Sequence, residues 1–400
     1  NLIFKNFINL NYFKKNLYKK NNIKLKKIIK KTFNFLEKKK FTLHVLSKKF
    51  DININKSDLK KFNKFQTVVL IGMGGSTLGA EAIYQSLKFK IKKNFYFLDN
   101  LDLIKIINIK KKIDKKNTLF IVVSKSGNTL ETLVNSNLFK NKINHKNTII
   151  ITESEKNLLN TFAKKKNILQ IDHKDYIGGR YSVLSEVGMI PAYLMGLKTN
   201  SFRKNLLSFF KSKKKIFLTE SILKLTQMYN SKKIRSIIFL NYAPELEKFL
   251  FWCQQLIAES LGKNGKGILP VVSSAPRDHH SLLQLYLDGP KDKLFYIFSL
   301  KSSKEIKTSS NIFGNSFKYA ENQKLSKIIT AQKISVIQSL KNRKIPYREF
   351  EINRLDEAIL GELFSYFILE TALVGNLVGI NPFNQPSVEE VKTLTRNYLN

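Results

Sequence analysis

From residue 67 onward, short and continuous apolar runs alternate with longer segments of helical spacing. The first set of apolar runs covers 67–72, 94–99, 119–124, 148–152 and 168–172, and a second set covers 235–241, 268–273 and 294–300, followed by a short predicted strand at 346–352. Strands with no polar face are buried on both sides, which is typical of parallel sheets covered by helices. The sequence therefore predicts an α/β fold with two lobes, each a mostly parallel sheet between two layers of helices.

The same pattern divides the chain into four segments. Residues 1–65 are rich in Lys and Asn, with apolar residues at irregular helical spacing, and predict a helical N-terminal extension. The first lobe is expected at 66–195, the second at 196–355, and a C-terminal helix and tail at 356–400. We find neither an uninterrupted apolar run of about 18 residues nor a signal-peptide pattern, so neither a membrane span nor secretion is expected.

The net charge of +40 raises the question of a nucleic-acid partner. Lysine dominates over arginine and is spread along the chain, and no helix-turn-helix, zinc-finger or RNA-recognition signature is present. We expect no specific nucleic-acid partner, although such a surface attracts polyanions weakly and favours an anionic substrate. The single cysteine, Cys253, cannot form an internal disulfide, which fits a reducing compartment such as the cytoplasm.

A glycine-rich turn, GMGGSTLG, follows the first predicted strand at 72–79. Such a turn places backbone N–H groups at the carboxyl end of the sheet, where anions bind. Gly72 and Gly74 fit a dinucleotide-binding pattern, but Thr77 occupies the third glycine position, and a nucleotide P-loop is absent. The turn thus predicts a close backbone approach at Gly75 and a hydroxyl, Ser76, at its tip.

A second turn of this type, SKSGNT, follows the predicted strand at 119–124. Ser124, Lys125, Ser126 and Thr129 offer hydroxyl and ammonium donors beside the start of a helix. That set suits a phosphate monoester, because the donors and the helix terminus can surround its terminal oxygens. No acidic residue is placed as a magnesium ligand, so we expect the turn to hold a phosphate rather than to transfer one.

The two turns look like the phosphate-binding turns of the sugar isomerase (SIS) fold, and four later motifs narrow the resemblance. IGGRYSVLSEVG (177–188), WCQQLIAESLGKNGKGI (252–268), DHHSLLQLYLDGP (278–290) and GINPFNQPSVEEVK (379–392) resemble segments of the glucose-6-phosphate isomerase family. The six motifs occur in order between residues 69 and 392. The chain departs from the family pattern where Asn384 replaces an aspartate and Pro386–Ser387 replaces a pair that ends in glycine.

This resemblance implies reversible isomerisation of glucose 6-phosphate and fructose 6-phosphate through a cis-enediol, in glycolysis and gluconeogenesis. By the same resemblance Glu259 is the catalytic base and Arg180 stabilises the enediolate. His280 opens the sugar ring and reaches the site from the partner subunit of a homodimer, and Lys392 assists ring opening. The family uses no cofactor, and the five histidines and one cysteine of this chain show no metal-ligand spacing.

The resemblance also assigns the substrate contacts. Phosphate and sugar are expected to contact Gly75, Ser76, Ser124, Lys125, Ser126, Thr129, Gln255 and Gln385. Gln255 and Glu259 are four residues apart, so both lie on one face of a helix and can reach one ligand.

Three other functions remain open from the sequence. One is a bifunctional phosphoglucose/phosphomannose isomerase with the same fold. Another is a non-catalytic sugar-phosphate sensor, which would keep the SKSGNT turn but need neither Glu259, His280 nor Lys392. The third is a polyanion-binding protein, whose affinity would fall steeply with salt.

Overall fold

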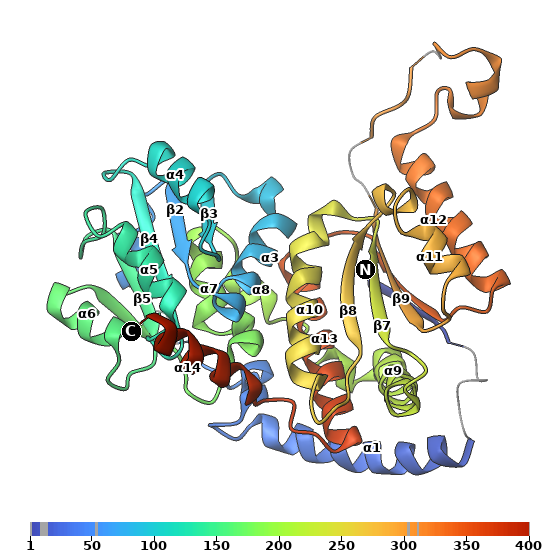
Figure 1. Ribbon diagram of the computed structural model, residues 1–400, viewed down its shortest axis with the longest axis horizontal. Helices are drawn as coiled ribbons and strands as arrows, with labels where there is room; N and C mark the ends of the chain where they lie inside the picture. The colour runs from blue at the N-terminus through green and yellow to red at the C-terminus, as the bar shows by residue number, and fades with distance from the viewer. Residues whose placement is uncertain (1, 9–14, 53–54, 302–304, 310–311, 400) are drawn as a thin grey trace.

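The computed structural model describes residues 2–8, 15–52, 55–301, 305–309 and 312–399. Figure 1 shows two lobes side by side, each built around one sheet. The strands of the first lobe are all parallel, in the order β3-β2-β4-β5-β6. They are β2 (Thr67–Ile71), β3 (Asn94–Leu98), β4 (Thr118–Val123), β5 (Thr148–Thr152) and β6 (Leu169–Asp172).

The second sheet has the order β1-β10-β9-β7-β8 and is parallel except at one edge. Its parallel strands are β7 (Ser236–Asn241), β8 (Leu269–Ser274), β9 (Lys293–Leu300) and β10 (Tyr347–Ile352). The prediction of a purely helical segment at 1–65 is wrong at its start, because β1 (Leu2–Phe7) pairs antiparallel with β10. Polar residues interrupt LIFKNF, so its short pattern did not resemble the buried strands; an edge strand tolerates such residues.

Helices cover both faces of the first sheet, as predicted. Val69 and Ile71 of β2 pack toward α4 (Leu103–Lys112), α5 (Leu130–Leu138) and α6 (Leu158–Lys166). Val68 and Leu70 point to the opposite face, toward α3 (Leu78–Ser86) and α7 (Glu186–Leu194). This alternation of successive side chains between two apolar faces explains why the strands read as continuous apolar runs.

The second sheet is covered in the same way. Ile238 and Leu240 of β7 face α11 (Leu283–Asp288) and α12 (Leu325–Asn342). Ile237 and Phe239 face α9 (Ser212–Ser231), α10 (Glu247–Leu261) and α13 (Glu357–Val378). The inner helices of both lobes share one apolar core, so the expected α/β fold of two mostly parallel sheets with flanking helices is confirmed.

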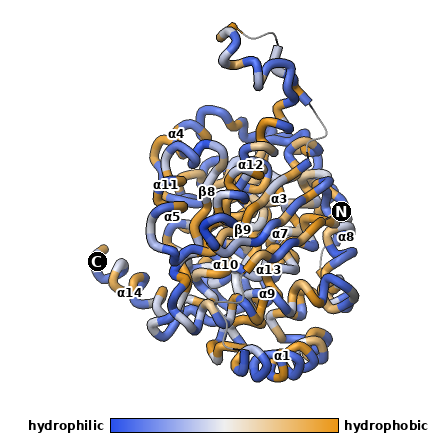
Figure 2. Tube along the Cα trace, turned by 90° about the vertical axis from the view of Figure 1, so that its right-hand side faces the viewer, coloured by the Kyte–Doolittle hydropathy of each residue, from blue (hydrophilic) through white to orange (hydrophobic). Residues whose placement is uncertain are grey.

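The remaining helices lie around these layers. They are α1 (Lys15–Leu36), α2 (Lys56–Lys60), α8 (Thr199–Phe202) and α14 (Ser387–Leu399), with short 3-10 turns η2 (Thr42–Leu46), η3 (Gly74–Ser76), η4 (Lys88–Lys90), η5 (Gly179–Leu184), η6 (Ser208–Phe210), η7 (Pro244–Leu246), η8 (Arg277–His279) and η9 (Asn315–Ala320). Figure 2 shows α14 projecting away from the body of the molecule. Exposed apolar side chains on it include Val391 and Tyr398.

Helix α13 is long and apolar enough to cross a membrane, although the sequence analysis expected no such segment. In the fold, 89% of its most apolar window is buried inside the protein. It packs against α8, α9 and α10, and its buried Glu362 and Glu370 pair with Lys214 and Arg348. Its length and hydropathy are therefore those of a central core helix.

The order of the first sheet fixes where a ligand can bind. Strands β2 and β4 are neighbours, and the chain leaves β2 toward β3 on one side and continues from β4 toward β5 on the other. A crevice opens outside the carboxyl ends of the strands at such a reversal. The GMGGSTLG turn follows β2 and the SKSGNT turn follows β4, so both border this crevice.

Candidate active site

The turn after β2 is held between the two lobes. A Cβ built on Gly75 would lie 2.2 Å from the carbonyl carbon of Gly179 and 2.5 Å from the amide nitrogen of Arg180. The close approach predicted at Gly75 is thus made to the backbone of η5. A Cβ on Gly72 would lie 2.8 Å from the carbonyl oxygen of Val123, at the end of β4. Only glycine allows η3 to touch both neighbouring segments at once.

The hydroxyl-rich turn after β4 is compact and partly enclosed. Ser124 is buried, and its hydroxyl lies 2.9 Å from that of Thr129, the residue before α5. Gly127 has a φ of +64°, and a Cβ there would fall 1.8 Å from Oδ1 of Asn157, so the turn depends on this glycine. Ser126 is exposed, and its Oγ accepts a 3.4 Å hydrogen bond from the amide of Asn128.

Lys125 engages the ends of the neighbouring strands. Its ammonium lies 3.5 Å from Oε1 of Glu153 and donates to the carbonyl of Asp175. Burial raises the pKa of Glu153, and the charge of Lys125 opposes that rise. A phosphate bound at this turn would therefore compete with Glu153 for the ammonium group.

His173 is a buried histidine beside this turn that the sequence analysis did not single out. Its side chain is almost wholly buried, and its Nε2 has no hydrogen-bond partner among the described residues. Burial, and then the positive charge of Lys125, lower its pKa from 6.5 to about 4. The folded protein therefore holds His173 neutral at pH values where an unfolded chain protonates it.

We predict an acid-sensitive contribution to stability from His173. Between pH 6.5 and about pH 4 His173 binds a proton in the unfolded chain but not in the folded chain. The free energy of unfolding therefore falls as pH falls. The expected loss from this group is about 3 kcal/mol, since each pKa unit corresponds to 1.36 kcal/mol. Chemical denaturation from pH 7 to 4.5 should show a shallower decline for His173→Gln than for wild type. The exposed His145→Gln control should follow wild type; equal slopes for all three proteins would contradict the assignment.

Arg180 is the most heavily bonded residue of the site. Its side chain is 2% exposed. Its Nη1 donates to Oε2 of Glu259 at 3.1 Å and to Oε1 of Gln385, and its Nε donates to Ser260 Oγ at 2.8 Å. Its Nη2 donates to the carbonyls of Pro382 and residue 384 at 2.8 and 3.0 Å. These contacts tie η5 to α10 and to the loop before α14, and fix one cation beside the Glu259 carboxylate.

Glu259 lies near the end of α10 and is 29% exposed in its side chain. Its second oxygen, Oε1, accepts a 2.8 Å hydrogen bond from Nε2 of Gln255, one helical turn earlier. A Cβ on Gly74 would be 2.8 Å from that same Nε2. The carboxylate is therefore held between Arg180 and Gln255, next to the glycine turn and accessible to solvent.

The loop before α14 completes this cluster. Lys263 follows α10, and its Nζ donates to the carbonyl of Asn381 and, at 3.0 Å, to Oδ1 of Asn384. Burial, and then the charge of Arg180, lower the pKa of Lys263 to about 8. The departure from the family's aspartate at Asn384 thus gives Lys263 a neutral partner in place of a carboxylate.

Two predicted residues, His280 and Lys392, are exposed. His280 follows η8 in the second lobe, and no contact among the described residues joins it to Arg180 or Glu259. Helix α11 begins three residues later, at Leu283. Lys392 lies on the projecting α14.

The structure does bring together Gly75, Arg180, Gln255, Glu259 and Gln385, and places Ser76 on the turn between them and the Ser124–Thr129 turn. The sequence analysis did not assign roles to Tyr181, Ser260 and Lys263, which hold this cluster. Ser260 Oγ accepts a hydrogen bond from Nε of Arg180 and lies 2.9 Å from the hydroxyl oxygen of Tyr181. The sequence did contain a signal for these three residues, because they lie within the GGRY and ESLGK motifs.

Within the residues that the structure describes, no three His, Cys, Asp or Glu side chains converge in a way that could hold an ion. The polar groups around Glu259 are instead a guanidinium, amides and hydroxyls, which recognise the hydroxyl and phosphate oxygens of a ligand by hydrogen bonding.

Comparison with known proteins gives the family of the chain. The family model for phosphoglucose isomerase matches residues 39–400. The glucose-6-phosphate isomerase of Methanocaldococcus jannaschii is 35% identical over 362 residues, covering 86% of this chain and 86% of that protein. The probable glucose-6-phosphate isomerase of Methanococcus maripaludis is 33% identical over 358 residues, covering 86% of this chain and 81% of that protein.

Solved structures show the same fold at lower identity. A hypothetical protein from Thermus thermophilus superposes with a TM-score of 0.81 at 22% identity, over 96% of both chains. A glucose-6-phosphate isomerase from Chlamydia trachomatis superposes with a TM-score of 0.72 at 22% identity, over 86% of this chain and 71% of that chain. The family match includes every motif from residue 69 to residue 392. The chain belongs to the phosphoglucose isomerase family and is an isomerase.

Proposed function

We propose that this chain interconverts D-glucose 6-phosphate and D-fructose 6-phosphate, as the curated relatives named glucose-6-phosphate isomerase do. The observation that carries the proposal is the cluster in which the Glu259 carboxylate lies 3.1 Å from the Arg180 guanidinium. A sugar bound with C1 and C2 beside Glu259 would give up the C2 proton to that carboxylate. The same carboxylate then returns a proton to C1 while a proton passes from O2 to O1, and the aldose becomes the ketose.

Arg180 suits the charge that develops between these two steps. Removing the C2 proton leaves negative charge on an enediolate oxygen, and a fixed cation lowers the energy of that state. Because a guanidinium stays protonated, Arg180 does not compete for the moving proton. Its bonds to Ser260 and the 382–384 backbone hold it in place before substrate arrives.

The phosphate is assigned to the turns at 74–76 and 124–129. Ser124 and Thr129 place two hydroxyls 2.9 Å apart at the start of α5, and Ser76 and Ser126 add two more hydroxyls on these turns. The N-terminus of α5 adds partial positive charge at the same point. The η3 turn lies between this anchor and Gln255, so a single extended sugar phosphate can reach from the hydroxyls to Glu259.

A coupled assay tests the proposal directly. Fructose 6-phosphate is supplied, and formation of glucose 6-phosphate is followed with a dehydrogenase specific for it. Turnover by the wild-type chain is expected, and its absence at all substrate concentrations would reject the function. A parallel reaction with mannose 6-phosphate distinguishes a bifunctional isomerase. We place the enzyme in glycolysis and gluconeogenesis in the cytoplasm.

We further propose that the enzyme is a homodimer and that His280 comes from the partner subunit. His280 is exposed and has no contact with Glu259 in its own chain, although ring opening requires a proton-transfer group near the sugar. Two arms project from the body: α14, and the described residues 305–309 and 312–324 between β9 and α12 (Figures 1 and 2). They expose large apolar side chains, among them Ile312 at 85% and Tyr398 at 88%, which suits burial against a second copy.

Hybrid dimers test the shared site. Glu259→Gln and His280→Ala are each expected to be nearly inactive alone. If each site combines Glu259 of one chain with His280 of the other, co-refolding the two variants restores one complete site per mixed dimer. An equimolar mixture then forms mixed dimers in about half of the population and recovers about a quarter of wild-type activity. A mixture that stays as inactive as its parents would show that His280 acts within its own chain or not at all.

A further inference from the structure

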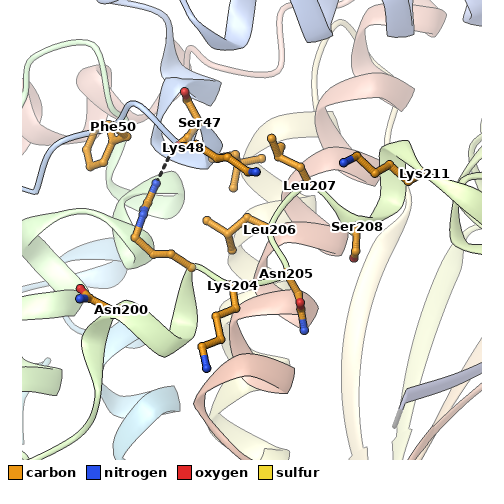
Figure 3. Close-up of a pocket in the computed structure, with 12 residues that line it drawn as sticks. Ser47, Lys48, Phe50, Asn200, Lys204, Asn205, Leu206, Leu207, Ser208 and Lys211 are labelled. Atoms are coloured by element: carbon orange, nitrogen blue, oxygen red, sulfur yellow. Dashed lines mark hydrogen bonds between the residues drawn. The ribbon is translucent and has the colours of Figure 1, made fainter.

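A second cavity lies between the N-terminal extension and the segment that joins α8 to α9. It has a volume of about 600 Å³ and is lined by residues 46–48, Phe50, Asn200, residues 203–208 and Lys211 (Figure 3). This volume is within the range of small-molecule sites. None of the lining residues belongs to the Glu259 cluster or to the hydroxyl-rich turns, so the cavity is separate from the active site.

All the charged residues that line the cavity are positive. Lys48, Arg203, Lys204 and Lys211 contribute four cations, and no lining residue is acidic. In Figure 3 the side chains of Lys48 and Lys211 extend toward one another from opposite sides of Leu207, whereas Lys204 points away. In the described parts of the chain, none of these three lysines forms an ion pair with a carboxylate. Like charges that face one another repel, and an anion between them removes that repulsion.

The wall of the cavity is fixed by Arg203. Its guanidinium donates to the carbonyls of Leu184, Val45 and Ser47 at 3.2, 3.0 and 2.6 Å. Burial lowers the pKa of Arg203 to about 10, and the charge of Glu186 opposes that effect.

The charged groups of the cavity are thus the two facing ammonium groups of Lys48 and Lys211, with the guanidinium of Arg203 fixed in the wall beside them.

We propose that this cavity is a second anion site that binds a small molecule with two or more linked phosphate groups. The phosphate groups would lie between Lys48 and Lys211. A multiply charged ligand is favoured because one compact anion can contact both ammonium groups, each through a charge-assisted hydrogen bond. The volume of about 600 Å³ suits a free small molecule rather than a nucleic-acid strand, which requires a groove that follows its backbone.

The test uses pyrophosphate as the probe and the full-length protein. Isothermal titration is performed at low salt with a saturating equilibrium mixture of glucose 6-phosphate and fructose 6-phosphate, which occupies the active site. The test variant is Lys48→Gln with Lys211→Gln. The matched control is Lys140→Gln with Lys146→Gln, two exposed lysines of the first lobe that remove the same charge elsewhere.

We expect one pyrophosphate per wild-type chain under these conditions, and an affinity at least about tenfold lower in the test variant, because two charge-assisted bonds are lost. The control should bind within about twofold of wild type. Both variants should keep the wild-type KM for fructose 6-phosphate. Three results would overturn the proposal: wild type that binds no pyrophosphate when the active site is full, a test variant with unchanged affinity, or a control that loses as much affinity as the test variant. The sugar-phosphate assay is read separately, so failure of the isomerase proposal would not affect this result.

Discussion

Replacing the carboxylate of Glu259 by an amide is expected to remove isomerisation while leaving substrate binding nearly intact. Glu259→Gln keeps the size of the side chain and an oxygen that can accept from Arg180 or Gln255. It removes the group that carries the proton between C1 and C2, and general bases typically contribute about 10²–10⁴ in rate. We therefore expect kcat to fall by about that factor, while the Kd for fructose 6-phosphate stays within a few-fold of wild type.

The control for this experiment is Glu245→Gln, an exposed carboxylate immediately before α10. It removes the same charge at the opposite end of α10, outside the cluster, and should leave kcat unchanged. If Glu259→Gln retained more than about a tenth of wild-type kcat, another group would have to be the base.

The second large effect is expected from a single methyl group at Gly75. Gly75→Ala would place Cβ 2.2 Å from the backbone carbon of Gly179 and 2.5 Å from the amide nitrogen of Arg180. Because the obstacle is backbone, η3 and η5 must move apart. We expect the free energy of unfolding to fall by about 1–3 kcal/mol, as for overpacked cores, and kcat/KM to fall by about 10²-fold as Arg180 is displaced.

A neighbouring glycine provides the control. Gly178 has an ordinary extended backbone, with φ of −65°, and a Cβ there would find its nearest atom at 3.7 Å. Gly178→Ala should therefore fold and act like wild type. Denaturation and steady-state kinetics on both variants separate the two positions; equal behaviour of Gly75→Ala and Gly178→Ala would show that the contact between η3 and η5 has no role in the site.

The elements that the sequence predicts well are those whose residues lack a polar face. The run TIIIT at 148–152 is buried at all five positions as β5. Its continuous apolar pattern is that of a strand covered by helices on both faces of a sheet. The strand β1 was missed because LIFKNF mixes apolar and charged residues over only six positions. Its pairing partner, β10, is more than 300 residues away, so no local pattern identifies the pair.

The sequence likewise indicated some features of the candidate site and missed others. Residues within the six motifs could be named, and the fold explains how Arg180 and Glu259, 79 positions apart, meet across the lobes. The contact of Lys125 with Glu153 was not predictable, because it depends on how the ends of β4 and β5 align. The burial of His173 likewise depends on tertiary packing around β6, which a lone histidine in the sequence does not reveal.

The most direct test of the whole account is a crystal structure of the Glu259→Gln protein with fructose 6-phosphate bound, since this variant should hold the substrate without converting it. We predict that the phosphate oxygens lie within hydrogen-bond distance of the Ser124 and Thr129 hydroxyls. We also predict that C1 and C2 lie beside the residue 259 amide and the Arg180 guanidinium. A phosphate bound elsewhere, or a sugar whose C1 and C2 are out of reach of residue 259, would contradict the assignment of this cluster as the isomerase site.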